Sequence, residues 1–229
     1  MPSKQVPPTQ TTPKQAPVKP LPAAASQDQL SPNQASSDEL SLEQLSFSNK
    51  FYALGDSFYS VVAPAPLKKP VWLHINTDVM DSLGLTLAGL KTPLNLDIFS
   101  GTATLADQIP IATVYSGHQF GGYTACLGDG RAMLIAQINT ADGVFDLQLK
   151  GAGPTPYSRR ADGRAVLRSS IREYLAGEAM HQLGIATSRA LCLVGSEEPV
   201  VREQVESGAT VARVARTHIR FGHFEYFHY

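Results

Sequence analysis

Cysteine, long apolar runs and an excess of either charge are all scarce in this sequence. Only Cys126 and Cys192 occur among 229 residues, which excludes a disulfide-stapled fold and a cysteine-based zinc site. No apolar run approaches the ~20 residues that span a bilayer, and the N-terminus lacks the apolar segment of a signal peptide. The 19 basic and 20 acidic residues leave a net charge of −1, so no basic field favours nucleic acid. These absences predict a soluble intracellular protein with neither a membrane nor a nucleic acid as its partner.

Arginine is missing from the first 130 residues. That part carries seven lysines against ten acidic residues, a net charge of −3, whereas the rest carries eleven arginines and Lys150 against ten acidic residues, a net charge of +2. Arginine is the side chain of bidentate phosphate and carboxylate recognition. Two interpretations stay open at this point: a solvated basic face, or a binding site for an anionic ligand.

Aromatic residues are missing before Phe47, and eight of the sixteen prolines lie in that segment. Such a segment buries too little apolar surface to offset the entropy of ordering it. We therefore expect a disordered tail over residues 1–46. A transit peptide is the weaker alternative, because the segment has no arginine and its prolines disfavour an amphipathic helix. Residues 47–229 are long enough to build a core and are expected to form one folded lobe.

Apolar patterning predicts mainly strands in this lobe. Strands are expected over residues 111–115, 131–138, 144–150, 189–194, 200–205 and 210–216. The strand 144–150 alternates between apolar and polar residues, so Lys150 shares a polar face with Asp146 and Gln148.

Two helices are predicted, one over residues 77–90 with Thr77 as its N-cap and a longer one over residues 163–183. In the longer helix, Asp162 is expected at the N-cap and Gly184 just past the C-terminus. Its apolar residues recur every four positions and are expected to face the core: Leu167, Ile171, Leu175, Ala179 and Leu183. The predicted fold class is α+β, an antiparallel sheet with one long helix.

The glycine-rich segment 117–130 and Lys150 are the candidates for nucleotide binding. Glycine lets a backbone approach a phosphate closely, but Gly128-x-Gly130 has no third glycine and no following helix, and no Walker A pattern occurs. On spacing alone a tight hairpin turn is favoured. A lysine that ends a strand after such a segment matches the kinase arrangement, in which a helix glutamate, here Glu173, orients the lysine. An ordinary surface lysine is the open alternative.

Two groups of arginines follow Lys150, and each fits either an anion site or a solvated face. The first is Arg159, Arg160, Arg164, Arg168 and Arg172, and the second is Arg213, Arg216 and Arg220. Three of the histidines, at positions 218, 223 and 228, are five residues apart, a spacing that gathers no metal ligands on a strand or a helix.

Several long motifs resemble the SelO family, also called YdiU, over a match that runs from about Phe47 to the end. They are YSGHQFG from Tyr115, LGDGR from Leu127, DLQLKGAGPTPYSR from Asp146, DGRAVLRSSIREYL from Asp162 and TSRALC from Thr187. The resemblance implies a protein-kinase-like N-lobe. It also implies an activity that transfers AMP from ATP to Ser, Thr or Tyr hydroxyls of proteins, with ATP bound in a flipped orientation together with Mg²⁺ (or Mn²⁺).

The resemblance also assigns roles to residues of this chain. Lys150 would hold phosphates and pair with Glu173, and Arg213 and Arg220 would accommodate the inverted triphosphate. The remaining positions expected to contact or line the nucleotide are Gly128, Gly130, Arg131, Asp162 and Gly163. Fixed cations are what a reaction needs when charge develops on the α-phosphoryl group and on leaving pyrophosphate.

Family members are about twice as long as this chain, and their general-base Asp and their metal ligands are expected downstream of Tyr229. The sequence is therefore interpreted as the ATP-binding half of a SelO-like enzyme, with no catalytic base and no metal ligand of its own. The alternatives are a catalytically inactive truncated fragment and a kinase-like phosphotransferase. The resemblance implies a cytoplasmic location for a bacterial member and a mitochondrial one for a eukaryotic member.

Overall fold

The computed structural model describes residues 40–228, so most of the predicted tail lies outside the described residues. Regular structure starts before Phe47, with a 3₁₀ turn η1 (Leu42–Gln44) and strand β1 (Ser46–Ser48). Leu42 is fully buried in the main core. Core packing in the described part therefore reaches back at least to this leucine.

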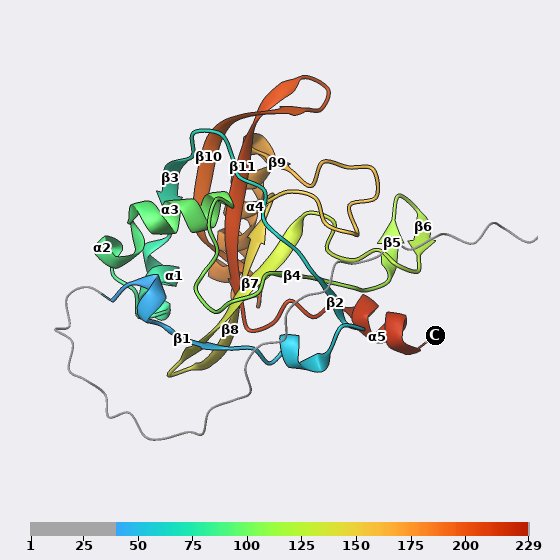
Figure 1. Cartoon of the computed structure of the whole chain (residues 1–229), viewed down its shortest axis with the longest axis horizontal. Helices are drawn as coiled ribbons and strands as arrows, with labels where there is room; N and C mark the ends of the chain where they lie inside the picture. The colour runs from blue at the N-terminus through green and yellow to red at the C-terminus, as the bar shows by residue number, and fades with distance from the viewer. Residues whose placement is uncertain (1–39, 229) are drawn as a thin grey trace, which may run out of the picture. The chain divides into compact units, whose positions relative to one another are not determined.

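The described residues form one large antiparallel sheet with a few helices (Figure 1). The strand order is β2-β4-β7-β8-β11-β10-β3, with β1 paired to β7 and β9 paired to β11. The remaining strands of this sheet are β2 (Tyr59–Val61), β3 (Val71–Ile75), β4 (Ile111–Thr113), β7 (Ala132–Thr140), β8 (Gly143–Lys150), β9 (Ala165–Val166), β10 (Arg189–Val201) and β11 (Val205–Ala215). A separate hairpin consists of β5 (Gly117–Gln119) and β6 (Gly122–Thr124). The predicted α+β class with an antiparallel sheet is confirmed, as is the hairpin in the glycine-rich segment.

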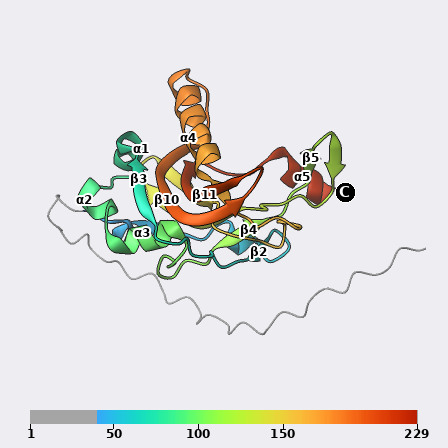
Figure 2. The same cartoon turned by 90° about the horizontal axis from the view of Figure 1, so that it is seen from above.

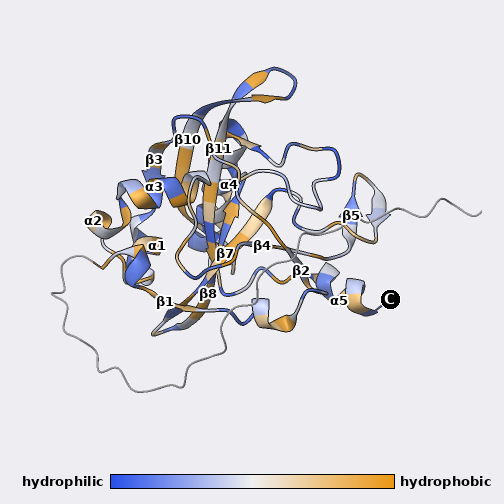
Figure 3. Cartoon of the chain, in the orientation of Figure 1, coloured by the Kyte–Doolittle hydropathy of each residue, from blue (hydrophilic) through white to orange (hydrophobic). Residues whose placement is uncertain are grey.

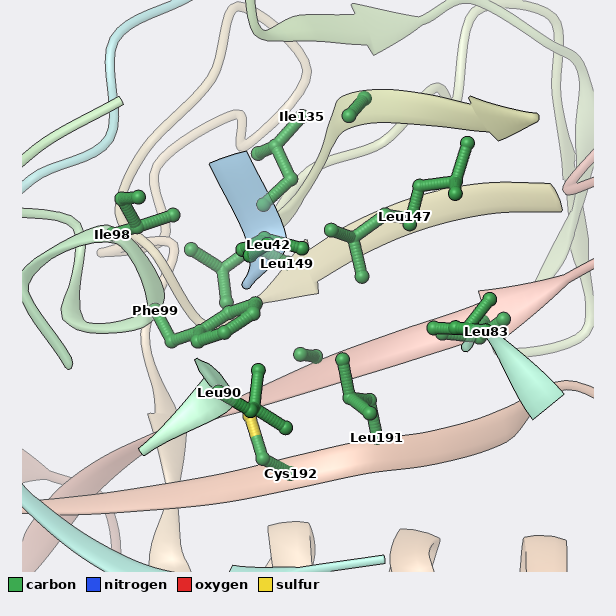
Figure 4. Close-up of a cluster of buried hydrophobic side chains, with 14 of the residues drawn as sticks. Leu42, Leu83, Leu90, Ile98, Phe99, Ile135, Leu147, Leu149, Leu191 and Cys192 are labelled. Carbon is green, nitrogen blue, oxygen red and sulfur yellow. The ribbon is translucent and has the colours of Figure 1, made fainter. Parts of the chain in front are cut away.

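One face of the sheet carries the main hydrophobic core. Alternate residues of the central strands, such as Leu147 and Leu149, point to this face and pack beneath the short helices (Figure 4). These helices are α1 (Thr77–Ser82), α2 (Leu87–Leu90) and α3 (Pro93–Ser100). Phe99 of α3 is fully buried and meets the ring of Trp72 edge-on, with centroids 5.9 Å apart.

The opposite face carries the long helix α4 (Leu167–Gln182), which packs on β10 and β11 and rises from the sheet (Figure 2). A smaller apolar cluster, including Val211 and Tyr174, lies under it. The short helix α5 (Phe221–His228) follows the last strand, and a 3₁₀ turn η2 (Tyr52–Leu54) lies near the start of the chain.

Helix α4 corrects two expectations. It begins at Leu167 rather than at residue 163, because Gly163 has a positive φ of 68° and β9 occupies the next residues. Asp162 therefore does not cap the helix. The expected core stripe is also wrong, since Leu175 is 62% and Leu183 is 73% exposed. Figure 3 colours the chain by hydropathy, and hydrophobic stretches are visible on β10. Ser170 is the buried residue of the helix, while Leu167 and Tyr174 pack against the smaller apolar cluster of the sheet.

Two further predictions differ from the structure. The helix expected over residues 77–90 is two helices, because Gly84 adopts φ 75° between them; Asn76 and Thr86 cap the two starts. The three strands expected after residue 189 are the two long strands β10 and β11. A register irregularity between Gly195 and Pro199 lies where the gap between the first two expected strands was predicted.

Candidate functional site

Lys150, at the end of β8, and Glu173 of α4 are in contact. The Lys150 ammonium donates a hydrogen bond to Oε2 of Glu173. The other carboxylate oxygen of Glu173 accepts from Nη1 of Arg213 on β11, at 3.0 Å. A single carboxylate is thus shared by two cations that come from neighbouring strands.

Arg213 is held by a third residue. Gln148 lies directly opposite it in the pairing of β8 with β11, and the Gln148 side-chain carbonyl accepts from Nη2 of Arg213. Arg213 is 8% exposed and Gln148 is 1% exposed. The Nε atom of Arg213 is buried and has no hydrogen-bond partner among the described residues. This buried guanidinium therefore keeps one unused donor.

The charges of this cluster do not cancel. Lys150 and Arg213 contribute two positive charges and Glu173 one negative charge, while Gln148 is neutral. Burial, with help from the nearby Arg213, lowers the pKa of Lys150. Burial alone would raise the pKa of Glu173, but Arg213 and Lys150 together hold that pKa below its usual value. An excess of buried positive charge is stabilised best by an anion.

The Gly128–Arg131 turn leads directly into this cluster. Ala132 pairs with Lys150 across β7 and β8, and the backbone N–H of Gly151 donates to the carbonyl of Arg131 at 2.8 Å. Gly128 adopts φ 60°, and a Cβ there would stand 2.3 Å from the ring of Tyr157. Only glycine fits this position, because the ring packs directly against the backbone.

Asp129 fixes this turn to the sheet. Its buried carboxylate accepts from the backbone N–H and the hydroxyl of Thr113 at 3.1 and 2.6 Å, and from the hydroxyl of Tyr115 at 3.3 Å. Its own carbonyl accepts from the hydroxyl of Thr155 at 2.6 Å. The backbone of Gly130 is fixed in the same way, since its carbonyl accepts from the hydroxyl of Ser158.

Tyr115 links Asp129 to the second expected arginine. The guanidinium of Arg220 lies 5.1 Å from the centre of the Tyr115 ring, and the Arg220 backbone N–H donates to Nδ1 of His223 at 2.9 Å. Burial, followed by the charge of Asp129, raises the pKa of Tyr115 to about 12, while Arg220 and Arg213 both oppose that rise. Arg220 therefore lies beside Tyr115, and the charges of both expected arginines act on this tyrosine.

Asp162 and Gly163 lie on a separate loop. The Asp162 carboxylate accepts two bonds from the guanidinium of Arg202, at 2.7 and 2.9 Å, and one from the backbone N–H of Arg164 at 2.9 Å. The hydrogen bonds to Arg202 lower the pKa of Asp162. Gly163 pairs with Gly153, and a Cβ at Gly163 would overlap that backbone at 2.1 Å. Within residues 40–228, no hydrogen bond or ion pair joins Asp162 to the Lys150 cluster.

Two hollows accompany these residues. A cavity of about 220 Å³ lies beneath α4 and is lined in part by Glu173 and Arg213. A larger groove of about 640 Å³ beside α5 is lined mainly by aromatic and aliphatic side chains, such as Phe58 and Phe227, and by none of the expected site residues. The smaller, charged cavity is the better candidate for an anionic ligand.

Residues 40–228 contain no group of three His, Cys, Asp or Glu side chains that could hold a metal ion. None of the helices in that range is long and apolar enough to cross a membrane.

Comparison with known proteins identifies the family of the chain. Residues 41–229 match the family model described as "Protein adenylyltransferase SelO". The match covers most of the chain, and the chain belongs to the SelO family.

Curated relatives agree with this assignment. A Pseudomonas fluorescens protein (strain SBW25) named "Protein nucleotidyltransferase YdiU" is 55% identical over 185 residues, which are 80% of this chain and 38% of that protein. Proteins of the same name from Pseudomonas putida (strain W619) and Ralstonia nicotianae are each 54% identical, over 80% and 77% of this chain and 38% and 34% of their own lengths. The chain spans little more than a third of these relatives.

Four residues that shape the site carry little or no signal in the sequence. Gln148 was placed on the polar face of its strand, but nothing in the sequence pairs it with an arginine 65 positions away. The position of Asp129 between two glycines is a weak sequence signal for its role in the turn. The roles of Tyr115 and Arg202 depend on contacts across the sheet and carry no local signal.

Proposed function

We propose that this chain holds ATP for the transfer of AMP to Ser, Thr or Tyr hydroxyls of proteins. The observation that carries the proposal is the buried excess of positive charge at Lys150, Glu173 and Arg213. Membership of the SelO family supports adenylyl transfer as the reaction. The kinase-like character of the lobe belongs to the same proposal and is supported by the lysine–glutamate pair between a strand and a helix.

Each expected residue has a part in this proposal. Glu173 orients Lys150 toward the phosphates, while Arg213, Arg220 and Arg131 add cations that stabilise charge on the leaving pyrophosphate. Four further residues would line the nucleotide: Gly128, Gly130, Asp162 and Gly163. The first two form a tight turn beside the cluster. Asp162 would reach the nucleotide from the loop that Arg202 secures.

The proposed Mg²⁺ or Mn²⁺ does not fit the described residues. The nearest carboxylate, Glu173, already accepts from two cations, and residues 40–228 offer no cluster of metal ligands. The described residues therefore bind and orient the triphosphate in this proposal, and no step is assigned to a metal.

The test compares ATP labelled on the α-phosphate with ATP labelled on the γ-phosphate. The chain is assayed alone and as a chimera, in which residues 41–229 replace the matching part of the Pseudomonas fluorescens relative. Incorporation of the α-label alone is expected for the chimera. Lys150→Met should abolish it, because the phosphates lose their anchor, whereas Lys91→Met, at an exposed lysine, should not change it.

Two other results would refute the proposal. Incorporation of the γ-label would instead show a kinase-like phosphotransferase. Full activity of Lys150→Met would show that the Lys150 cluster takes no part in the reaction. Calorimetry with ATP on the 229-residue chain tests the remaining alternative, an inactive fragment, for which no binding is expected.

A further inference from the structure

Gln148 stands out among the residues around the cluster. It is a polar side chain with 1% exposure on the face of β8 that also carries Lys150. Burying an amide is costly unless it is hydrogen-bonded. Its side-chain carbonyl accepts a hydrogen bond from Nη2 of Arg213, which lies directly opposite on the paired strand.

The guanidinium of Arg213 is consequently held at two points. Glu173 on α4 accepts from Nη1, and Gln148 on β8 accepts from Nη2. These two acceptors sit on different elements, so together they fix the plane of the guanidinium. Because a planar guanidinium recognises phosphate by directed hydrogen bonds, its orientation decides which ligand atoms it can reach.

The neutrality of Gln148 matters as much as its position. A glutamate here would also accept from Arg213, but it would give the cluster two negative charges against the two positive charges of Lys150 and Arg213. Glutamine keeps the net positive charge that a triphosphate needs. We propose that Gln148 is a positioning residue, a neutral anchor that orients Arg213 toward the triphosphate without cancelling its charge. This inference rests on the proposed function.

Two substitutions at Gln148 separate orientation from charge. Gln148→Met keeps the volume and removes the acceptor, so Arg213 loses one of its two anchors. A misplaced catalytic-site cation lowers rates by about tenfold to a hundredfold, and kcat for transfer of the α-label should fall by about tenfold or more. Gln148→Glu keeps the anchor and cancels the charge. It should raise KM for ATP by about tenfold and change kcat by less than about threefold.

The control is Gln137→Met. Gln137 on the neighbouring strand β7 also makes hydrogen bonds through both ends of its amide, to Asp146 at 2.7 Å and from the backbone of Phe51 at 2.8 Å. It contacts neither arginine of the proposed site in the described structure. The variant should lower the urea midpoint as Gln148→Met does and leave kcat and KM within about twofold of wild type.

The decisive measurement is a double-mutant cycle in the chimera, with kcat/KM for ATP as the readout. In an Arg213→Met background, Gln148→Met should cause less than about a twofold further loss, since its whole effect passes through Arg213. Losses that multiply, or a control that loses as much activity as Gln148→Met, would overturn the inference alone. Full activity of Arg213→Met would overturn the proposed role of that arginine and the inference with it.

Discussion

Removing the carboxylate of Glu173 and removing the ammonium of Lys150 should affect stability in different ways. Glu173→Gln leaves Lys150 and Arg213 without a counter-charge, and their side chains are only 19% and 10% exposed. Lys150→Met leaves Arg213 and Glu173 as a balanced pair. The two ends of one ion pair are therefore not equivalent.

The size of the effect follows from burial. Removing one partner of a buried ion pair costs about 3–5 kcal/mol, and because Glu173 is 29% exposed we expect the lower end, about 3 kcal/mol. At about 2–4 °C per kcal/mol for a protein of this size, the Tm of Glu173→Gln should fall by roughly 6–12 °C. Lys150→Met should change the free energy of unfolding by less than about 1 kcal/mol, because it removes a desolvated charge.

Urea unfolding at neutral pH measures both variants. The signal is the fluorescence of Trp72, the only tryptophan, which packs against Phe99 in the core. The matched control is Glu197→Gln, which breaks a surface pair with Lys69 whose side chains are 67% and 75% exposed. It should shift the free energy of unfolding by less than about 0.5 kcal/mol. The reasoning fails if Lys150→Met is as destabilising as Glu173→Gln, or if Glu173→Gln behaves like the control.

Three further predictions concern acid, backbone and thiols. Because the folded-state pKa of Glu173 is lowered, its ionised carboxylate stabilises the folded state. This stabilisation is complete above the unfolded-state pKa of about 4.3 and is lost as the pH falls through the folded-state pKa. Urea midpoints measured from about pH 6 to about pH 3 should therefore fall less steeply in Glu173→Gln than in wild type. Gly128→Ala should destabilise by at least about 1 kcal/mol more than Gly121→Ala in urea, since both have positive φ but only Gly128 faces a ring. A thiol reagent should modify exposed Cys126 in the native chain and reach buried Cys192, whose pKa is raised by burial, only after unfolding; equal native reactivity would contradict this.

Local patterning predicted the central strand β8 correctly but failed for the long helix. The alternation in residues 144–150 predicted which face of β8 would be apolar, and Leu147 and Leu149 are fully buried on that face. The fourfold spacing that predicted the core face of α4 failed, since Leu175 and Leu183 are exposed while Tyr174 packs against the sheet. Glu173 is only partly exposed, and its carboxylate is held by two cationic partners.

The site itself was predictable only in part. Lys150 and Glu173 could be paired from kinase-like spacing, and they are in contact. The contact of Arg213 with Gln148 depends on β8 pairing with β11, and β9, α4 and β10 separate these two strands along the chain. Asp162 was expected to cap a helix. It instead binds Arg202, which lies in the turn between β10 and β11. No local rule indicates such long-range register.

The sparse burial of α4 has a consequence for local unfolding. Only Ser170 of its residues is buried, whereas four of the eight residues of β8 and seven of the eleven residues of β11 are buried. Opening free energies follow the amount of buried contact, so amide protons of α4 should exchange with solvent well before those of the two strands. Glu173 is a residue of this helix. Each local opening of α4 therefore withdraws the carboxylate from Lys150 while the lysine stays fixed on the sheet, and the charge of the cluster fluctuates on the timescale of the helix.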